Sequence, residues 1–316
     1  MMTAAPNSPW MPVFLASCLL VLAGCRGSLP AEFIPDKESA ADSVARVDYY
    51  ENAAKQYYEG GKYQQSVAMW DKFLGERPTD QWAKFGLAKS LQMISTPPTL
   101  RRAERIIVGD ETDPGLLCLE WQHPTRGDIK FEVKSTLAIV YSQLADFYDR
   151  DIRDIDVKLA KDPNADSQNL DQWLTRQKRM RDNLLHKSAP LWRDVLEASP
   201  DNPYALAGLS KAYILTNNEQ AGIHYADRYI DLSRKSQEQW RERLREWEQM
   251  KKGDVSPEQR AFYLEKIHGA REKEKGMLML LGSVHMRRDE FVKAIDRYDE
   301  VLALDPAHVA ALVERA

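Results

Sequence analysis

A short set of residues in the last complete unit of the chain constrains the fold more than any other feature. Between positions 276 and 306 the set contains a Leu-Gly pair, a small residue, a bulky aromatic residue and a proline, namely Leu281, Gly282, Ala294, Tyr298 and Pro306. Small residues let two helices approach closely, the larger side chains fill the space between them, and the residue before a proline is disfavoured in a helix. The pattern predicts a helix–turn–helix unit with a period of about 34 residues.

Two other stretches keep the same intervals. The residues at these positions are Ala54, Tyr57, Ser66, Trp70 and Pro78 in the first stretch and Ser188, Trp192 and Pro200 in the second. Few windows alternate apolar and polar residues over strand lengths, whereas apolar residues three and four apart are common. The whole chain therefore favours an all-α fold.

These residues resemble those of the tetratricopeptide repeat (TPR) family. The resemblance implies a superhelical array of helix–turn–helix units whose concave face binds an extended peptide or a helix of a partner protein. We expect one repeat domain over 43–316. Its repeats are expected near 44–78, 79–114, 133–200, 202–275 and 276–306, with a capping helix at 308–316.

Two of these repeats are longer than the family pattern implies. Apolar residues at helical spacing continue through 133–198 and again through 219–286, which predicts two elongated helical hairpins. Pro190 lies inside the first and is expected to kink or split its second helix. In the second hairpin, Ala221 and Tyr225 are expected at the small and bulky positions, one residue off the strict interval.

The least regular part of the folded region follows the second repeat. In that repeat, residues 95–98 are expected to lengthen the turn, with the next helix starting at Leu100. Residues 114–129 are then expected to form a loop. Cys118 stands in an apolar run there and is expected to be buried as a small apolar side chain.

The N-terminus indicates export and lipidation. An apolar run from Met11 to Leu22 is too short for a membrane span and is typical of a secretory signal. The sequence Leu-Ala-Gly-Cys ending at Cys25 resembles a bacterial lipobox, which implies a signal peptide over 1–24 and lipid, including palmitate, on Cys25. Residues 25–42 are expected to form a flexible tether. No Lys or Arg precedes the apolar run, so Met1, Met2 and Met11 all stay open as start residues.

This resemblance also suggests a cellular location. Arg26 follows the cysteine in place of the aspartate that often retains bacterial lipoproteins at the inner membrane. We therefore expect an envelope protein held by lipid at the outer membrane and facing the periplasm. A cytoplasmic location is the alternative if the lipobox match is accidental.

No constellation of catalytic or ligand-binding residues emerges from the sequence. The six histidines have no metal-ligand spacing, no glycine-rich phosphate loop is present, and the net charge of −4 argues against a nucleic-acid binder. We expect no cofactor, no metal, no small-molecule substrate and no enzymatic activity.

Three hypotheses for function follow. The first is a scaffold that mediates protein–protein interactions in an envelope assembly, secretion or pilus-type complex. The second is an enzyme, or an accessory subunit of a cell-wall enzyme, suggested only by Trp121 and His123 in the irregular loop. The third is a cytoplasmic TPR adaptor.

Overall fold

The computed structural model describes residues 40–118, 122–123, 127–161, 167–250 and 256–316. The expected signal peptide and Cys25 lie outside these residues. Contacts divide the chain into two compact units, 1–48 and 49–316, and most of the helical residues lie within the second.

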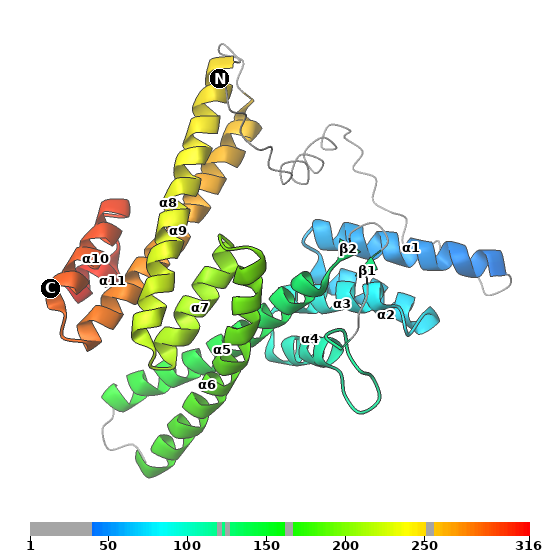
Figure 1. Cartoon of the computed structure of the whole chain (residues 1–316), viewed down its shortest axis with the longest axis horizontal. Helices are drawn as coiled ribbons and strands as arrows, with labels where there is room; N and C mark the ends of the chain where they lie inside the picture. The colour runs from blue at the N-terminus through cyan, green and yellow to red at the C-terminus, as the bar shows by residue number, and fades with distance from the viewer. Residues whose placement is uncertain (1–39, 119–121, 124–126, 162–166, 251–255) are drawn as a thin grey trace, which may run out of the picture. The chain divides into compact units, whose positions relative to one another are not determined.

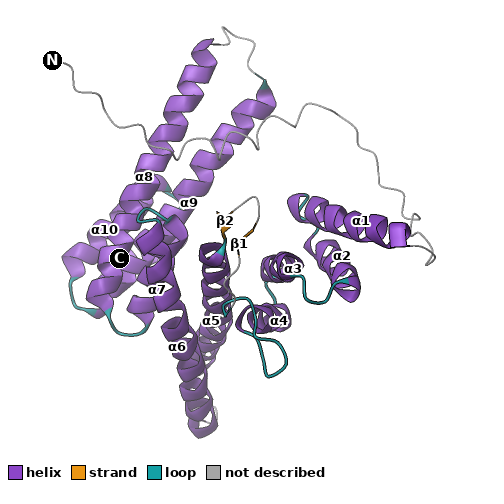
Figure 2. Ribbon diagram, turned by 45° about the vertical axis from the view of Figure 1, so that its right-hand side comes forward, coloured by secondary structure: helices purple, strands orange, loops and turns teal. Residues whose placement is uncertain are grey.

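The described residues form helices, apart from one pair of two-residue strands (Figures 1 and 2). The strands are β1 (Gln122–His123) and β2 (Gly127–Asp128), which pair antiparallel. The helices are α1 (Ala40–Glu59), α2 (Tyr63–Glu76), α3 (Gln81–Ile94), α4 (Pro97–Val108), α5 (Lys130–Lys161), α6 (Ser167–Ala198), α7 (Pro203–Leu215), α8 (Glu219–Met250), α9 (Pro257–Arg287), α10 (Phe291–Leu304) and α11 (Val309–Arg315). The prediction of an all-α fold is confirmed.

Helices that follow one another in the chain also pack against one another. From α2 to α11 each helix contacts the next, and α5 additionally contacts α3 and α7. One apolar cluster around Trp192 joins α5, α6 and α7, and a second around Leu281 joins α7 to α11. Burying the core between neighbours in this way is characteristic of repeat arrays.

One turn design recurs at three places in the array. In each, a proline stands two residues after the end of a helix, and a polar side chain then caps the next helix. The three caps accept a hydrogen bond from the backbone N–H three residues later: Asp80 from Ala83 (2.8 Å), Asn202 from Ala205 (3.1 Å) and His308 from Ala311 (3.2 Å). These bonds satisfy donors that a helix N-terminus otherwise leaves unpaired.

The two elongated hairpins are present as predicted. Helices α5, α6 and α8 have 32 residues each and α9 has 31, which corresponds to roughly 48 Å. Figures 1 and 2 show α5 beside α6 and α8 beside α9. The outer part of the first hairpin has its own apolar cluster of Ile152, Ile155 and Leu174. Ring contacts of Trp240 and Trp247 with Tyr263 join the outer part of the second.

Pro190 was expected to kink or split the second helix of the first hairpin, and the expectation of a split is wrong. Helix α6 runs without interruption from Ser167 to Ala198 with Pro190 inside it. Proline removes one N–H and so leaves the carbonyl of His186 without its usual helical partner. Both residues are exposed, so water can bond to that carbonyl and the helix continues.

The turn of the second repeat is also shorter than expected. Only Ser95 and Thr96 lie between α3 and α4, because α4 begins at Pro97 rather than at Leu100. Proline has no N–H, but the first residue of a helix does not need one, so Pro97 starts the helix instead of extending the loop.

Cys118 is exposed, contrary to the expectation that it is buried. The backbone N–H groups of Leu116 and Leu117 both donate to the carbonyl oxygen of Ile107, at 2.9 and 3.0 Å. These bonds hold Leu116 in the core, and the turn that follows leaves the Cys118 side chain on the surface.

In the second hairpin the small position lies 12 residues after Ser210, which is the interval from Ala54 to Ser66 in the first repeat. Gly222, rather than Ala221, makes the close approach: a Cβ atom there would lie 2.5 Å from Cγ1 of Ile214 and 3.0 Å from the carbonyl oxygen of Ser210. The bulky position falls on Ala226, which is fully buried, while Tyr225 is only partly buried. Because Ala226 is a small residue at the bulky position, the interval is difficult to recognise in the sequence.

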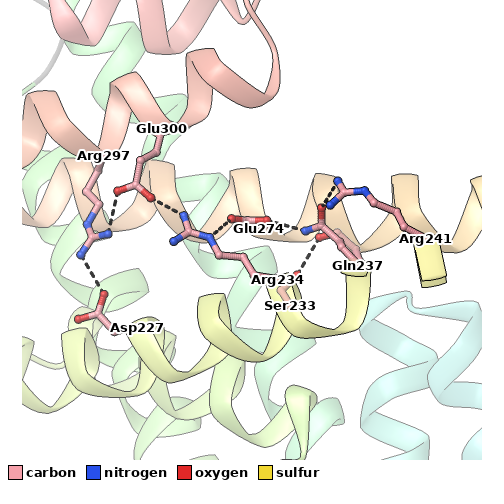
Figure 3. A network of polar contacts seen from close by, with 9 residues as sticks. Asp227, Ser233, Arg234, Gln237, Arg241, Glu274, Arg297 and Glu300 are labelled. Carbon is pink, nitrogen blue, oxygen red and sulfur yellow. Dashed lines mark hydrogen bonds and ion pairs between the residues drawn. The ribbon is translucent and has the colours of Figure 1, made fainter. Parts of the chain in front are cut away.

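A polar network joins the base of the second hairpin to α10 (Figure 3). The carboxylate of Glu274, only 2% exposed, accepts hydrogen bonds from Nε of Arg234 at 2.6 Å and from Nε2 of Gln237 at 2.5 Å. Arg234 also pairs with Glu300, which in turn pairs with Arg297. The network therefore ties α8, α9 and α10 together through one buried charge.

Two glycines of α9 allow a paired test of the packing. A Cβ at Gly282 would lie 2.4 Å from Cε1 of Tyr298, whereas a Cβ at Gly276 would meet no heavy atom within 4 Å. We expect Gly282→Ala to destabilise the protein by about 1–3 kcal/mol through overpacking. Gly276→Ala should stabilise it by about 0.5–1 kcal/mol, because alanine restricts the unfolded chain more. Urea denaturation measures both, and shifts of the same sign would contradict the close packing of Gly282 on Tyr298.

The turn between α9 and α10 supplies a prediction for acid stability. Glu290 accepts a hydrogen bond from Nδ1 of His285 at 2.7 Å and pairs with Lys293 and Arg288. The hydrogen bond to His285, aided by these cations, lowers the pKa of Glu290 from 4.5 to about 2. A carboxyl group with a lowered folded-state pKa stabilises the fold above its unfolded pKa and loses that contribution as the pH falls.

We therefore expect Glu290→Gln to be less stable than the native chain at pH 6. The difference should shrink as the pH falls from about 4.5 towards 2. Thermal unfolding across this range measures it. Glu242→Gln, at an exposed position on α8, is the control and should show little difference at any pH. A Glu290→Gln deficit that is independent of pH would contradict the prediction.

Candidate functional site

The first of two comparable grooves lies on α1, α2 and α3. We call it the N-terminal groove, and its volume is about 220 Å³. Trp70 of α2 and Gly86 of α3 line it, with Trp82 and Lys89 of α3 and Tyr58 of α1 beside them. Half of the residues that line it are therefore aromatic, and Lys89 adds an ammonium group from α3.

The second, which we call the central groove, lies mainly on α5, α6 and α7. Its volume is about 360 Å³, and Trp192 of α6 and Gly208 of α7 line it. Tyr204 and Lys211 of α7 stand beside them, and Lys273 of α9 also lines it.

A further groove of about 620 Å³ adjoins the central groove. It lies on α8 and α9 and shares Pro203, Tyr229 and Lys273 with the central groove. The two grooves therefore lie next to each other, and together their lining residues extend from α5 across α7 to α9.

The N-terminal and central grooves are built on the same plan. Four positions correspond at a constant separation of 122 residues: Trp70 with Trp192, Trp82 with Tyr204, Gly86 with Gly208, and Lys89 with Lys211. In each groove, a tryptophan on the second helix of one repeat lies under the first helix of the next. The aromatic and lysine side chains come from that next helix.

Glycine is what allows the next helix to lie against the indole. A Cβ at Gly86 would fall 2.5 Å from Cε2 and Cζ2 of Trp70, and one at Gly208 would fall 2.3 Å from Nε1 of Trp192. The repeat pattern does not predict the role of either glycine, because its intervals describe the close approach of two helices within one repeat, whereas these contacts lie between repeats. The available signal was a glycine 16 residues after each tryptophan.

The lysines of the two grooves lie over aromatic rings. Nζ of Lys89 is 5.7 Å from the ring centre of Tyr58 and 5.5 Å from that of Phe85, and Nζ of Lys273 is 5.6 Å from the ring centre of Tyr204. Among the residues that the structure describes, neither Lys89 nor Lys273 forms an ion pair. Lys211, in contrast, pairs with Asp146.

Burial raises the pKa of one tyrosine in each groove, Tyr58 in the N-terminal groove and Tyr229 in the central groove. Burial, with a smaller contribution from Tyr63, raises the pKa of Tyr58, and burial raises the pKa of Tyr229 to about 12. Both phenols therefore retain their proton near neutral pH and can donate a hydrogen bond to a bound partner.

The repeat residues singled out in the sequence lie at helix–helix contacts or at helix ends. The packing residues are buried, apart from half-buried Tyr57: Ala54, Ser66, Trp70, Ser188, Trp192, Leu281, Gly282, Ala294 and Tyr298. Pro78, Pro200 and Pro306 are exposed in the three turns of common design. The hydroxyl of Ser66 donates to the carbonyl oxygen of Ala54 at 2.8 Å, which links α2 to α1.

The residues behind the enzyme hypothesis gain no support. Trp121 and the side chain of His123 lie outside what the structure describes, as does Cys25. In the described part of the chain, no group of three or more His, Cys, Asp or Glu side chains could hold a metal ion. Among the described helices, none has both the length and the apolar character of a membrane span.

No protein-family model and no curated protein matches the chain. Among solved structures, TTC0263, a thermophilic TPR protein of Thermus thermophilus, is similar at 12% identity, with 85% of this chain and 96% of that chain covered and a TM-score of 0.38. Yeast Tom70 is similar at 10% identity, with coverage of 87% and 76% and a TM-score of 0.19. This chain is an all-α, TPR-like array. That assignment rests on the repeated helix packing, since these scores are low.

Proposed function

We propose that the chain is a scaffold that binds extended segments of partner proteins in its grooves. The observation that carries the proposal is the pair of adjoining grooves whose lining residues extend from α5 across α7 to α9, with Tyr204, Tyr229 and Lys273 among them. A groove that crosses successive repeats suits a chain segment better than a compact ligand. In this proposal the protein acts by binding and performs no catalysis of its own.

A photocrosslinking amino acid at Tyr204 tests this role. Tyr204 is 61% exposed and lines the central groove, so a bound segment would pass within reach of its side chain. We expect discrete protein adducts in living cells when the crosslinker replaces Tyr204. The matched position is Arg193, an exposed residue of α6 outside the three grooves, where these adducts should be absent. The same adducts at both positions, or none at Tyr204, would argue against the proposal.

We also propose that lipid on Cys25 attaches this scaffold to a bacterial envelope membrane, with the folded part facing the periplasm. The support is the lipobox-like sequence after an apolar run of signal-peptide length. More than one acyl chain makes such attachment stable. A role in an envelope assembly, secretion or pilus-type complex fits this location, and a cell-wall enzyme is an alternative partner. A cytoplasmic adaptor is the alternative location.

Palmitate labelling with membrane fractionation tests the anchor. We expect the native chain to incorporate labelled palmitate and to sediment with membranes, and Cys25→Ala to lose both properties. Cys118→Ala is the matched control because that thiol is exposed in the folded domain, and it should behave like the native chain. An unlabelled, soluble native chain would favour the cytoplasmic alternative.

A further inference from the structure

We propose that the N-terminal and central grooves bind the same kind of ligand, a partner segment in which an aromatic side chain stands next to carboxylates. One chain would then bind two such motifs. The inference rests on the proposed scaffold function and specifies the chemistry of its partner.

The first argument is that the two grooves are copies. Over the stretch from Ser66 to Lys89, eight residues are identical to those 122 positions later: Ser66, Trp70, Leu74, Pro78, Ala83, Gly86, Leu87 and Lys89 recur as Ser188, Trp192, Leu196, Pro200, Ala205, Gly208, Leu209 and Lys211. The turn inside this stretch has the same cap in both copies, from Asp80 and from Asn202. The identical residues include the tryptophan, the glycine and the lysine that line each groove.

The second argument is the size and the apolar character of each groove. Pockets for small molecules and cofactors usually measure about 300–1,000 Å³. The N-terminal groove, at about 220 Å³, is below that range and the central groove, at about 360 Å³, is at its lower end. Each groove therefore has room for one large side chain of a longer bound segment, and in the central groove the rest of the segment can continue into the adjoining groove on α8 and α9. The aromatic residue at the edge, Trp82 or Tyr204, favours an aromatic guest, since rings pack well edge-to-face or offset.

The third argument is charge. Two lysines and one carboxylate line each groove: Lys55, Lys89 and Glu59 in the first, and Lys211, Lys273 and Asp146 in the second. Each groove therefore carries a net charge of +1. Lys55 pairs with Glu51 and Lys211 pairs with Asp146, which leaves one ammonium in each groove without an ion pair among the described residues.

Those two ammonium groups belong to Lys89 and Lys273. They come from different positions, because Lys211, the counterpart of Lys89, is the lysine that pairs with Asp146. Each lies over an aromatic ring at the groove surface, and a ligand carboxylate beside the bound aromatic side chain would complete its hydrogen bonding. The same combination of apolar floor and unpaired cation thus appears twice among the described residues of one chain.

Selection from a library of random dodecapeptides displayed on phage tests the chemistry directly. With purified full-length protein as the target, we expect enrichment of peptides that carry an aromatic residue flanked by aspartate or glutamate. Calorimetry with one such synthetic peptide should give a stoichiometry of two peptides per chain. Replacing its aspartates by lysines, or its aromatic residue by alanine, should weaken binding at least tenfold.

Two charge reversals then assign the sites. Lys89→Glu and Lys273→Glu should each reduce the stoichiometry to one, and the double variant should bind no peptide. Lys178→Glu, at an exposed position of α6, is the matched control and should leave two sites. Circular dichroism confirms that each variant is folded, and Lys89→Gln and Lys273→Gln serve if a reversal disturbs the fold.

The outcomes separate this inference from the function on which it rests. Enriched peptides that lack acidic or aromatic residues, but still lose binding in the groove variants, would overturn the inference and leave the scaffold function intact. A stoichiometry of one for the native chain would overturn the claim that both grooves bind the same motif. A library that yields no binding peptide at all would overturn both.

Discussion

Trp192→Ala is expected to lower the free energy of unfolding by about 3–5 kcal/mol, the usual cost of truncating a large buried aromatic side chain. Trp192 is 2% exposed and packs between helices from two repeats, against Ala138 of α5 and against Ala205 and Leu209 of α7. Its indole Nε1 also donates to the hydroxyl of Ser142 at 3.3 Å. Its removal would thus open a cavity where three helices meet.

Urea denaturation followed by circular dichroism measures this effect. Trp247→Ala is the comparison, because Trp247 is only half-buried in the outer part of the second hairpin, and it should cost less than half as much. Equal losses from the two variants would contradict the central role of Trp192.

The contact with Gly208 can be isolated by combining variants. Gly208→Ala should destabilise the native chain, because its Cβ would fall 2.3 Å from Nε1 of Trp192. In the Trp192→Ala background the clash is gone, and the same substitution should become neutral or stabilising, since alanine favours the helix. A Gly208→Ala effect of the same sign in both backgrounds would show that the indole is not the obstacle.

The second large effect is expected from Arg234→Glu at the base of the second hairpin. This change leaves the buried carboxylate of Glu274 without its cation and places a like charge beside Glu300 (Figure 3). Breaking a buried pair by removing one partner costs about 3–5 kcal/mol. Because Arg234 is itself 46% exposed, solvent screens part of the interaction, and we expect a loss near the lower end, about 3 kcal/mol.

The matched control is Arg245→Glu on the same helix. Arg245 pairs only with the exposed Glu238 among the described residues, and such surface pairs contribute about 0–1 kcal/mol. A partial rescue is expected from Glu274→Gln in the Arg234→Glu background, because the buried group is then neutral. Thermal unfolding compares the variants. If both reversals cost the same, the buried carboxylate is not the centre of the network.

The sequence predicted the helical array well where the packing depends on the spacing of residues within a single repeat. Ser66 and Trp70 mark where a helix packs closely on its neighbour, and Pro78 marks where that helix ends. All three features depend on residues that are close together in the sequence. The three turns that contain Pro78, Pro200 and Pro306 are predictable for the same reason, since proline and a capping side chain act on adjacent backbone groups.

The grooves were not predictable in the same way, because they depend on contacts between repeats. The role of Gly208 becomes visible only when α7 is placed on Trp192, and that of Lys273 only when α9 is placed beside Tyr204. The uninterrupted helix at Pro190 and the exposure of Cys118 were not predictable for a related reason. A sequence does not show that His186 and Pro190 share an exposed face, nor that two backbone bonds to Ile107 turn the thiol outward.

The first hairpin has two separate apolar clusters, which implies that its length can change without a change in the central groove. Ile152, Ile155 and Leu174 share no member with the cluster around Trp192. Removing two turns from each helix beyond Ile152 would shorten the arm by roughly 11 Å without touching a residue that lines the central groove. The length of the hairpin can therefore vary while the central groove keeps its lining residues.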